Sequence, residues 1–527
     1  MKHRSVIAIC FFFCFSFVWA QGGWYQYNAS EVKKLEYIAL AQGALNPFTV
    51  FPFDSTDVLI LAQTANVPFE QTINTNIVFG LGIEFNPAIY SAFSFDSYTI
   101  NNGSWKTRKP IILVPVTMQY ADWFTAFVQY DIREDHNTLE YPGAPNNWSN
   151  IPDNFEYIDF TAPFEAWIGL QKSVFSILAG RYSARIGNGY TGSLVLSDAA
   201  DFYDTVRVQY KLPGFAYTIQ FISIYPLVNN SELASKITTW QKNALYHHID
   251  VMIGKRIAIG LTEAMMIGGM DVPLAAFNPL MIFHDLFLWN HIAGVSQGFM
   301  PASSFLSAEI RINPWKYIEL YGSFAMNQFQ TDFEKSYYQA TTIPNAIGFL
   351  AGIKTAIPFG DGWFTGVIEY VYTNPWLYIR ENELNSWFWY RALTSNYAGA
   401  TQAVTMPLGY PTGPDSIVFS ISLGYEIFDK LRVSASFASV TRGENNAYTP
   451  YEESEHAVNL KTPTGIPERL VKGDTSCTYS FSQLFSIFAQ LEYLYYTNFT
   501  HIDGLIHEQL NVSLGLVLKL CYERKIE

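Results

Sequence analysis

Long stretches of strict apolar–polar alternation are the feature that most constrains the fold of this chain. In the last stretch every second residue from Leu510 to Leu520 is leucine or valine, and most residues between them are small or polar. A period of two is typical of a β-strand with two different faces. Ordinary strands have about five or six residues, whereas about 11 residues cross a bilayer at a tilt. This stretch therefore predicts a membrane-crossing strand.

The same alternation recurs along the chain, at Ile77–Phe85, Phe364–Tyr372, Ile417–Ile427 and Leu431–Phe437, with a tight turn expected at Asp429–Lys430. No water inside a bilayer satisfies backbone N–H and C=O groups, so strands cross only when a closed barrel pairs them all. We therefore predict an all-β fold, a transmembrane antiparallel β-barrel with small polar residues facing its lumen. Short turns should lie at the periplasmic rim and long loops outside.

Composition supports a barrel over a large soluble domain. Only 15% of the 527 residues are charged and 17% are aromatic, whereas a soluble surface needs more charge. A barrel needs less, because its outer band is apolar and its rims carry aromatic side chains. The formal net charge is −14, and it becomes −16 if the N-terminal residues 1–20, which include Lys2 and Arg4, are removed on export. This acidity disfavours nucleic acid as a partner.

The N-terminus has the pattern of an export signal. Lys2 and Arg4 precede an apolar run from Val6 to Val18, and Ala20 offers a cleavage position. The run has about 13 residues, fewer than the roughly 20 of a membrane-spanning helix. We expect residues 1–20 to be a signal peptide and the mature protein to reach the cell outer membrane of a diderm bacterium. No later apolar helix is long enough to span a bilayer.

Residues 21–66 have a different pattern, which predicts a periplasmic helical segment ahead of a barrel formed by residues 67–527. Ser30 is a candidate N-cap for a helix that Gly43 ends, and residues 54–57 offer caps for a second helix over Val58–Thr64. Such a pair of helices is either a plug or a linker. The best candidates for long external loops are Thr441–Ser476, Asp135–Asp153 and Asn382–Gly413. The stretch Pro273–Trp289 is expected to be a buried or pore-facing loop.

Three segments resemble the capsule assembly Wzi family of outer-membrane proteins: residues 180–204, residues 260–284 and Pro407–Asp415. The first carries GRYSARIGNG and the motif LVLSD, the second carries GLTEA and FNPLMIFH, and the third reads PLGYPTGPD. Their order and spacing agree across most of the chain after residue 20. The resemblance implies a barrel of about 18 strands that a periplasmic helical segment helps to occlude. It also implies that the protein holds capsular polysaccharide at the cell surface as a lectin.

Candidate carbohydrate-binding residues lie in or near the glycine-bearing turns of these segments. Charged groups there can bind sugar hydroxyls through paired hydrogen bonds. The alternative is a lumenal network of satisfied charges, which barrels contain whether or not they bind a ligand. For Asn278, a turn before Pro279 is favoured over ligand binding. Aromatic residues such as Trp387, Trp389, Tyr390 and Tyr397 are either sugar-stacking residues or, for most of them, rim or packing residues. The candidates are Arg181, Arg185, Asp198, Asp201, Asp204, Glu263, Asn278, His284 and Asp415.

No signature of an enzyme, a cofactor site or a metal site is present in the sequence. It lacks a nucleophile elbow, a zinc-type histidine pair, a phosphate loop and a dinucleotide fingerprint. His247 and His248 are adjacent, so on a strand they project to opposite faces. Beyond the leader only Cys477 and Cys521 remain, enough for one disulfide but not for a disulfide framework.

The main hypothesis is a non-enzymatic monomeric barrel, embedded in outer-membrane lipid, that binds or anchors surface polysaccharide of the capsular type. An extended glycan held by many weak contacts needs no strong individual site. The competing hypothesis is a passive porin-like channel or transporter for small solutes. A third is an adhesin whose loops meet host ligands.

Overall fold

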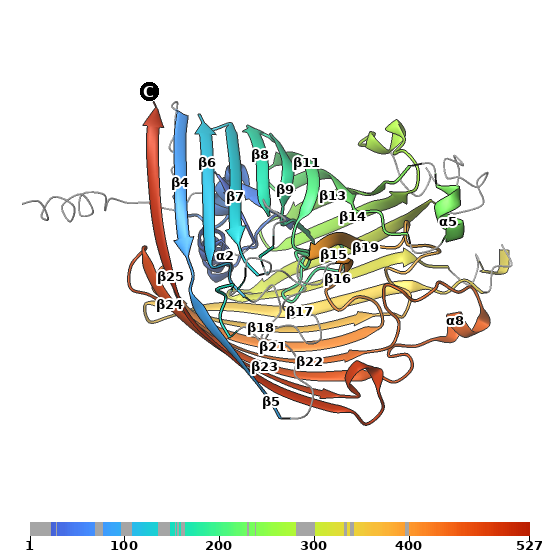
Figure 1. Ribbon diagram of the computed structural model, residues 1–527. Coiled ribbons are helices and arrows are strands. Elements are labelled where there is room, and N and C mark those ends of the chain that lie inside the picture. Colours follow the sequence, from blue (N-terminus) through green and yellow to red (C-terminus); the bar gives the residue numbers. More distant parts are fainter. Residues whose placement is uncertain are drawn as a thin grey trace, which may run out of the picture.

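The chain forms a closed antiparallel β-barrel whose strands follow one another in chain order, from β4 to β25 (Figure 1). The computed structural model describes residues 23–27, 29–68, 77–95, 108–134, 148–152, 154, 158–159, 164–228, 231–237, 239–280, 301–330, 335–337, 342–395 and 400–526. The barrel strands are β4 (Ile77–Phe85), β5 (Ala88–Ser94), β6 (Ile112–Tyr120), β7 (Phe124–Ile132), β8 (Glu165–Lys172), β9 (Phe175–Tyr182), β11 (Tyr203–Leu212), β12 (Phe215–Ile224), β13 (Lys242–Ile253), β14 (Ile257–Gly268), β15 (Ala302–Trp315), β16 (Ile318–Gln328), β17 (Ala346–Phe359), β18 (Gly362–Thr373), β21 (Ser416–Ile427), β22 (Leu431–Arg442), β23 (Glu468–Ser480), β24 (Phe485–Thr497) and β25 (Ile506–Ile526).

The barrel closes where β25 pairs with the first two strand segments. Residues 518–526 of β25 pair with β4, and residues 509–515 pair with β5. β4 and β5 are therefore two halves of one strand, interrupted at Asn86 and Pro87, because proline supplies no N–H to the ladder. The 19 strand segments among the described residues thus form an 18-stranded barrel, and the predicted fold class is confirmed.

Short and long connections alternate around the barrel, as predicted for an outer-membrane barrel. Turns such as residues 173–174, 254–256 and 360–361 lie at the end that also carries the C-terminus, here called the inner end. Long connections lie at the opposite, outer end. Short helices lie in the long connections: α5 (Ser231–Lys236), η2 (Leu274–Phe277), α8 (Glu455–Asn459) and η4 (Phe499–His501).

The three predicted loops are placed differently or only partly described. The loop expected over Thr441–Ser476 is shorter, because β22 runs to Arg442 and the charged residues from Glu468 onward belong to β23. A lumen-facing strand tolerates such charges, which is why composition alone suggested a loop. Asn382–Gly413 lies within the long connection 374–415, but the described part of that connection folds into the lumen instead of remaining external. Most of Asp135–Asp153 is outside the described residues.

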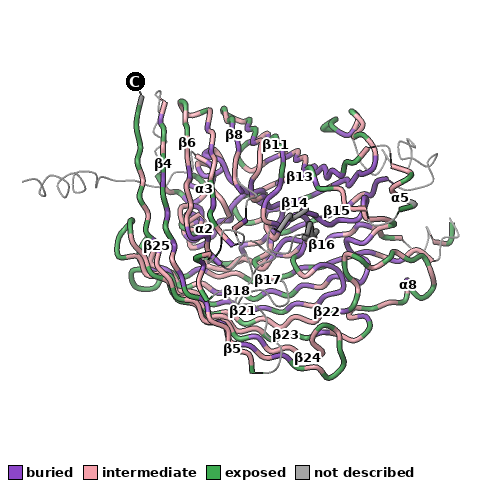
Figure 2. The backbone as a smooth tube through the Cα atoms, in the orientation of Figure 1, coloured by how far each residue is buried: buried purple, intermediate pink, exposed green. Residues whose placement is uncertain are grey.

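The two faces of the strands differ in burial as their alternation predicts. In β21, Phe419 and Leu423 are exposed on the outer wall, whereas Ser420 and Ser422 are buried inside. In β4, Phe79, Leu81 and Ile83 are exposed, and Glu84 points inward. Figure 2 shows this alternation of buried and exposed residues along the strands. An apolar outer wall with a polar interior places the protein in the outer membrane.

The segment before the barrel folds into the inner end of the lumen. It contains β1 (Trp24–Tyr25), α2 (Ser30–Gln42), β2 (Val50–Phe51), β3 (Phe53–Asp54) and α3 (Ser55–Thr64). Residues 23–66 are called the plug segment below. Tyr37 and Leu40 of α2 pack against Ala258 of β14 and Ala356 of β17, which face the lumen. In Figure 1, α2 lies within the ring of strands.

The helix boundaries agree with the sequence except at one cap. Gly43 ends α2 in the left-handed conformation, as predicted. Ser30 is not the N-cap of α2; that position is Ala29, which has no capping side chain. Asp54 caps α3 and forms a capping box with Asp57. Among the described residues, no helix is long and apolar enough to cross a membrane.

Two long connections also fold into the lumen, from the outer end. They are residues 183–202, with β10 (Arg185–Ile186), and residues 374–415, with the hairpin of β19 (Phe388–Ser395) and β20 (Ala400–Pro407). These two segments are called the inward loops. The Ser197 N–H donates to the Leu408 carbonyl at 2.8 Å, and the Tyr378 hydroxyl donates to the Leu194 carbonyl at 2.8 Å. Two of the segments that resemble the Wzi family are therefore packed together inside the barrel.

Candidate functional site in the barrel lumen

Buried ion pairs attach the plug segment to the barrel wall. Lys211 of β11 pairs with Asp54 and lies 3.1 Å from Asp57, and all three side chains are almost fully buried. The guanidinium of Arg207, also on β11, donates to the Pro52 carbonyl at 2.7 Å. A buried charge is tolerated only when it is paired and hydrogen-bonded. These contacts therefore hold the plug segment in one position.

The two carboxyl groups that meet Lys211 have opposite pKa shifts. Burial opposes ionisation of Asp54, but Lys211 outweighs it and holds the pKa below its usual range. Burial, and then the Asp54 charge, raise the pKa of Asp57 to about 6. Near pH 6 the second carboxyl group of the cluster therefore takes up a proton.

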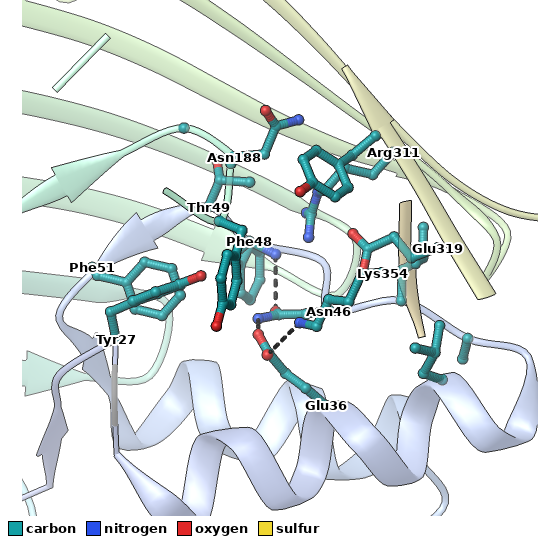
Figure 3. Close-up of a pocket in the computed structure, with 17 residues that line it drawn as sticks. Tyr27, Glu36, Asn46, Phe48, Thr49, Phe51, Asn188, Arg311, Glu319 and Lys354 are labelled. Atoms are coloured by element: carbon teal, nitrogen blue, oxygen red, sulfur yellow. Dashed lines mark hydrogen bonds and ion pairs between the residues drawn. The ribbon is translucent and has the colours of Figure 1, made fainter. Parts of the chain in front are cut away.

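A second anchor joins α2 to β17 near a small cavity (Figure 3). Glu36 accepts a hydrogen bond from the Asn46 amide at 2.8 Å and pairs with Lys354 at 3.1 Å. Burial opposes ionisation of Glu36, but Lys354 and Asn46 hold its pKa below its usual value. The cavity beside it has a volume of only about 60 Å³, which suits a few water molecules rather than a sugar ring.

Two larger cavities lie on either side of Tyr27. One, of about 380 Å³, is lined by polar residues of β7 and β8 and by the first inward loop. The other, of about 420 Å³, lies between α2 and the strands β17, β18, β21 and β22. Both are lined by Tyr27, Arg185 and Asp198. The Arg185 guanidinium stacks 4.2 Å from the centre of the Tyr27 ring and lies 3.4 Å from the Asp198 carboxylate.

The wall formed by β21–β25 and β4 carries a series of inward-facing ion pairs. They join Arg432 to Glu426, Arg442 to Glu468, Lys472 to Glu492 and Lys519 to Glu84. The four cationic side chains are 36–47% exposed, whereas their carboxylate partners are only 5–12% exposed. The cations therefore project into the lumen while the carboxylates lie against the wall. Arg432, Arg442, Lys472 and Lys519 are called the cation ladder below.

Three of the predicted site residues lie inside the barrel. Arg185 and Asp198 border both large cavities. Asp201 accepts from Arg391 at 2.6 Å, and the same guanidinium donates to Asp159 at 2.8 Å. Because this group is buried, it ties the inward loops together. Arg185 and Asp198 are therefore the predicted residues that are best placed to meet a ligand.

Three other candidates lie on the outer wall, so the alternative of a lumenal charge network does not apply to them. Arg181 and Asp204 form a two-pronged ion pair, with nitrogen–oxygen distances of 2.8 and 2.9 Å, on the outer side of β9 and β11. Inward-facing neighbours such as Tyr182 are buried instead. Glu263 shares the outer face of β14 with Leu261, which is 50% exposed.

The remaining candidates have structural positions or are not described. Asn278 is exposed, and its side chain accepts from the Leu280 N–H at 3.1 Å, which is the turn expected around Pro279. In the described part of Pro273–Trp289, which was expected to be a buried or pore-facing loop, Ala276 is buried but Leu274 and Leu280 are each 89% exposed. Asp415 is buried and accepts from the Thr464 N–H at 3.2 Å, at the base of two loops. His284 lies outside the described residues.

The aromatic candidates that the structure describes pack in the core, and the two cysteines lie on different faces of the wall. Trp387, Trp389 and Tyr390 are buried in the core of the inward loops, and Tyr397 lies outside the described residues. Cys477 faces outward and Cys521 inward, so the two thiols lie on opposite faces of the wall. Within the part of the chain that the structure describes, no group of three or more His, Cys, Asp or Glu residues is arranged to hold a metal ion.

The cation ladder was not singled out from the sequence, although the signal was present. Arg432 and Lys519 occupy polar positions of alternating strands, which places them on the lumenal face. Arg432 pairs with Glu426 across the turn between β21 and β22. Lys519 of β25 pairs with Glu84 of β4, and these two strands are far apart in the sequence. The exposed cations and buried carboxylates become visible only when the wall is assembled.

Comparison with solved structures finds similar outer-membrane barrels. Wzi, a carbohydrate-binding outer-membrane β-barrel involved in group 1 capsule assembly in Escherichia coli, matches with a TM-score of 0.55 and 11% identity. The match covers 94% of this chain and 99% of that one. OprD of Pseudomonas aeruginosa matches with a TM-score of 0.41 and 8% identity, over 86% and 97% of the two chains. No family model matches the sequence, and no curated protein is similar to it. The likeness to Wzi supports the barrel fold and nothing beyond it.

Proposed function

We propose that this protein is a non-enzymatic barrel of the Wzi type that binds or anchors surface polysaccharide, acting as a monomer without a cofactor. The observation that carries the proposal is that the lumen is filled from both ends, by the plug segment and by the inward loops. A barrel filled in this way is better suited to holding a ligand than to free diffusion. The similar Wzi barrel is itself a carbohydrate-binding protein.

The space that remains in the lumen is suited to sugars. The two large cavities, of about 380 and 420 Å³, fall within the ~300–1,000 Å³ typical of ligand sites. Both cavities are lined by the Tyr27 ring and by the carboxylate of Asp198, whose side chain is 35% exposed, and these groups combine an aromatic surface with a hydrogen-bond acceptor. A repeating polymer that meets several such sites gains affinity from their number, so each contact can be weak.

A second candidate function is a channel for small solutes, which the exposed cation ladder favours. Charged lumen walls set the selectivity of channels, and the half-exposed cations of the ladder lie on the lumenal face of β22, β23 and β25. On this reading the lumen conducts solutes between the plug segment and the strands β21–β25.

Conductance of the purified protein in planar bilayers, measured beside its retention on a glycan array, discriminates these functions. We expect few and small current steps, together with retention of polysaccharide. Large steady currents without glycan retention would favour the channel. Deletion of residues 23–66 is the matched control, because it removes one of the two segments that fill the lumen and should therefore raise the current.

A further inference from the structure

We infer that the cation ladder and the cavity at its inner end form a binding site for acidic glycans, whose carboxylate groups pair with the four cations. The inference rests on the proposed function, because it specifies which class of polysaccharide the lumen takes. A uronate-rich chain presents carboxylates at regular intervals, and a row of separated cations matches such a polymer better than a single pocket does.

The ladder spans the height of the barrel. Arg442 ends β22 at the outer end, and Arg432 lies one residue into the same strand at the inner end. Lys472 lies opposite Ala438, between these two levels. The Lys519 N–H donates to the Leu484 carbonyl in the turn at the inner end. A chain that enters from outside therefore meets cations at successive depths.

The charge that each pair presents to the lumen is positive, although each pair is neutral as a whole. The carboxylates of Glu426, Glu468 and Glu492 are mostly buried and occupied by their partners. The inward-facing Asp474 accepts from the Gln490 amide at 2.6 Å. With 46 acidic and 32 basic residues in the chain, an exposed basic row is contrary to the overall composition.

The larger cavity continues the ladder at its inner end. Four cations line it, Lys33, Arg185, Lys354 and Arg432, against the three carboxylates of Glu36, Asp198 and Glu426. Burial, and then the charge of Arg432, lower the pKa of Lys33 to about 8. The lining therefore carries one more cation than carboxylates, and a bound carboxylate would balance that charge.

Calorimetric titration of the full-length protein in detergent tests the inference, with oligogalacturonate as the acidic probe. Dextran oligosaccharides serve as the neutral probe and inorganic phosphate as the small anion. Arg432→Gln and Lys472→Gln each remove one ladder cation. Arg469→Gln is the matched control, because Arg469 is exposed on the outer face of β23. Circular dichroism and heat-modified gel migration check that each variant is folded.

We expect oligogalacturonate to bind, and each ladder variant to weaken binding about two- to fivefold, the effect of a half-exposed charge pair. Added salt should weaken binding further, and Arg469→Gln should have no effect. Equal binding of dextran, unaffected by the variants, would overturn the inference and leave the proposed function standing. Phosphate binding as tight as that of oligogalacturonate would also overturn it. Binding of neither glycan would overturn both.

Discussion

Charged side chains inside the barrel differ in how far they are buried, and their contribution to stability differs with it. Lys211 is almost completely buried and needs both Asp54 and Asp57 as partners. Lys472, with one carboxylate partner, keeps more than a third of its side chain in contact with water. The buried group contributes to the position of the plug segment, since an unpaired buried charge is costly. The half-exposed group contributes little to stability and remains available to a ligand.

The raised pKa of Asp57 predicts a pH dependence of stability. The folded pKa of about 6 exceeds the unfolded value of about 4. Between these two values the folded state binds more protons than the unfolded state. The free energy of unfolding therefore falls as the pH rises from about 4 to about 6. Asp57→Asn keeps an acceptor for the Asp54 N–H, which now donates to Asp57 at 2.9 Å. We expect wild type, relative to this variant, to lose about 2–3 kcal/mol between pH 4 and pH 7.

Thermal unfolding of both proteins across this pH range measures the difference. The lowered pKa of Asp54 acts in the opposite sense, and its carboxyl group is present in both proteins. Parallel curves for the two proteins would contradict a titration of Asp57 in this window.

At the scale of elements, close packing determines how the plug segment fits against the strands. A Cβ atom on Gly169 of β8 would meet the indole ring of Trp24 at less than contact distance. Trp24 is buried and packs against Trp167, with ring centres 6.1 Å apart. The absence of a side chain at residue 169 therefore lets β1 lie directly on the wall.

Gly169→Ala should loosen the plug segment, because an added methyl group overpacks this contact, at a cost of about 1–3 kcal/mol. We expect faster limited proteolysis within residues 23–66 while the barrel stays intact. Gly473→Ala on β23 is the matched control, since a Cβ there meets no atom within 4 Å. Equal rates of proteolysis for the two variants would show that the packing of Trp24 on the wall does not depend on the missing side chain at residue 169.

At the scale of the whole molecule, the bilayer decides which face of each strand is apolar. Leu514 of β25 is 56% exposed on the outer wall and lies opposite Ala489, near the middle of β24. Its neighbour Ser513 points inward. The same substitution at these two positions therefore compares lipid with the lumen at one depth of the barrel.

Leu514→Arg should destabilise the barrel by about 2–4 kcal/mol, the cost of an arginine at the bilayer midplane. Ser513→Arg should cost much less, because water and polar groups in the lumen solvate the guanidinium. Denaturant titration of protein folded into lipid vesicles measures both values. A larger penalty for the lumenal variant would reverse the assignment of the two faces.

The alternation of residues by itself determined the strands and faces of β4, β21, β22 and β25. On this side of the barrel the lumen is polar, so the inner residues differ chemically from the lipid-facing ones. The turn at Asp429–Lys430, the stop at Gly43 and the capping residues of α3 also followed from local rules, because each depends only on neighbouring residues.

Only the tertiary structure decided the faces of the strands that surround the plug segment and the inward loops. Leu178 and Tyr182 of β9 point inward and are buried against packed chain, so both faces of the strand are apolar. This removes the period-two signal, so the sequence could not show that Arg181 and Glu263 lie on the outer face. The cation ladder was likewise visible only in the tertiary structure, because the exposed fraction of a charged side chain depends on how strands that are distant in sequence assemble around the water-filled lumen.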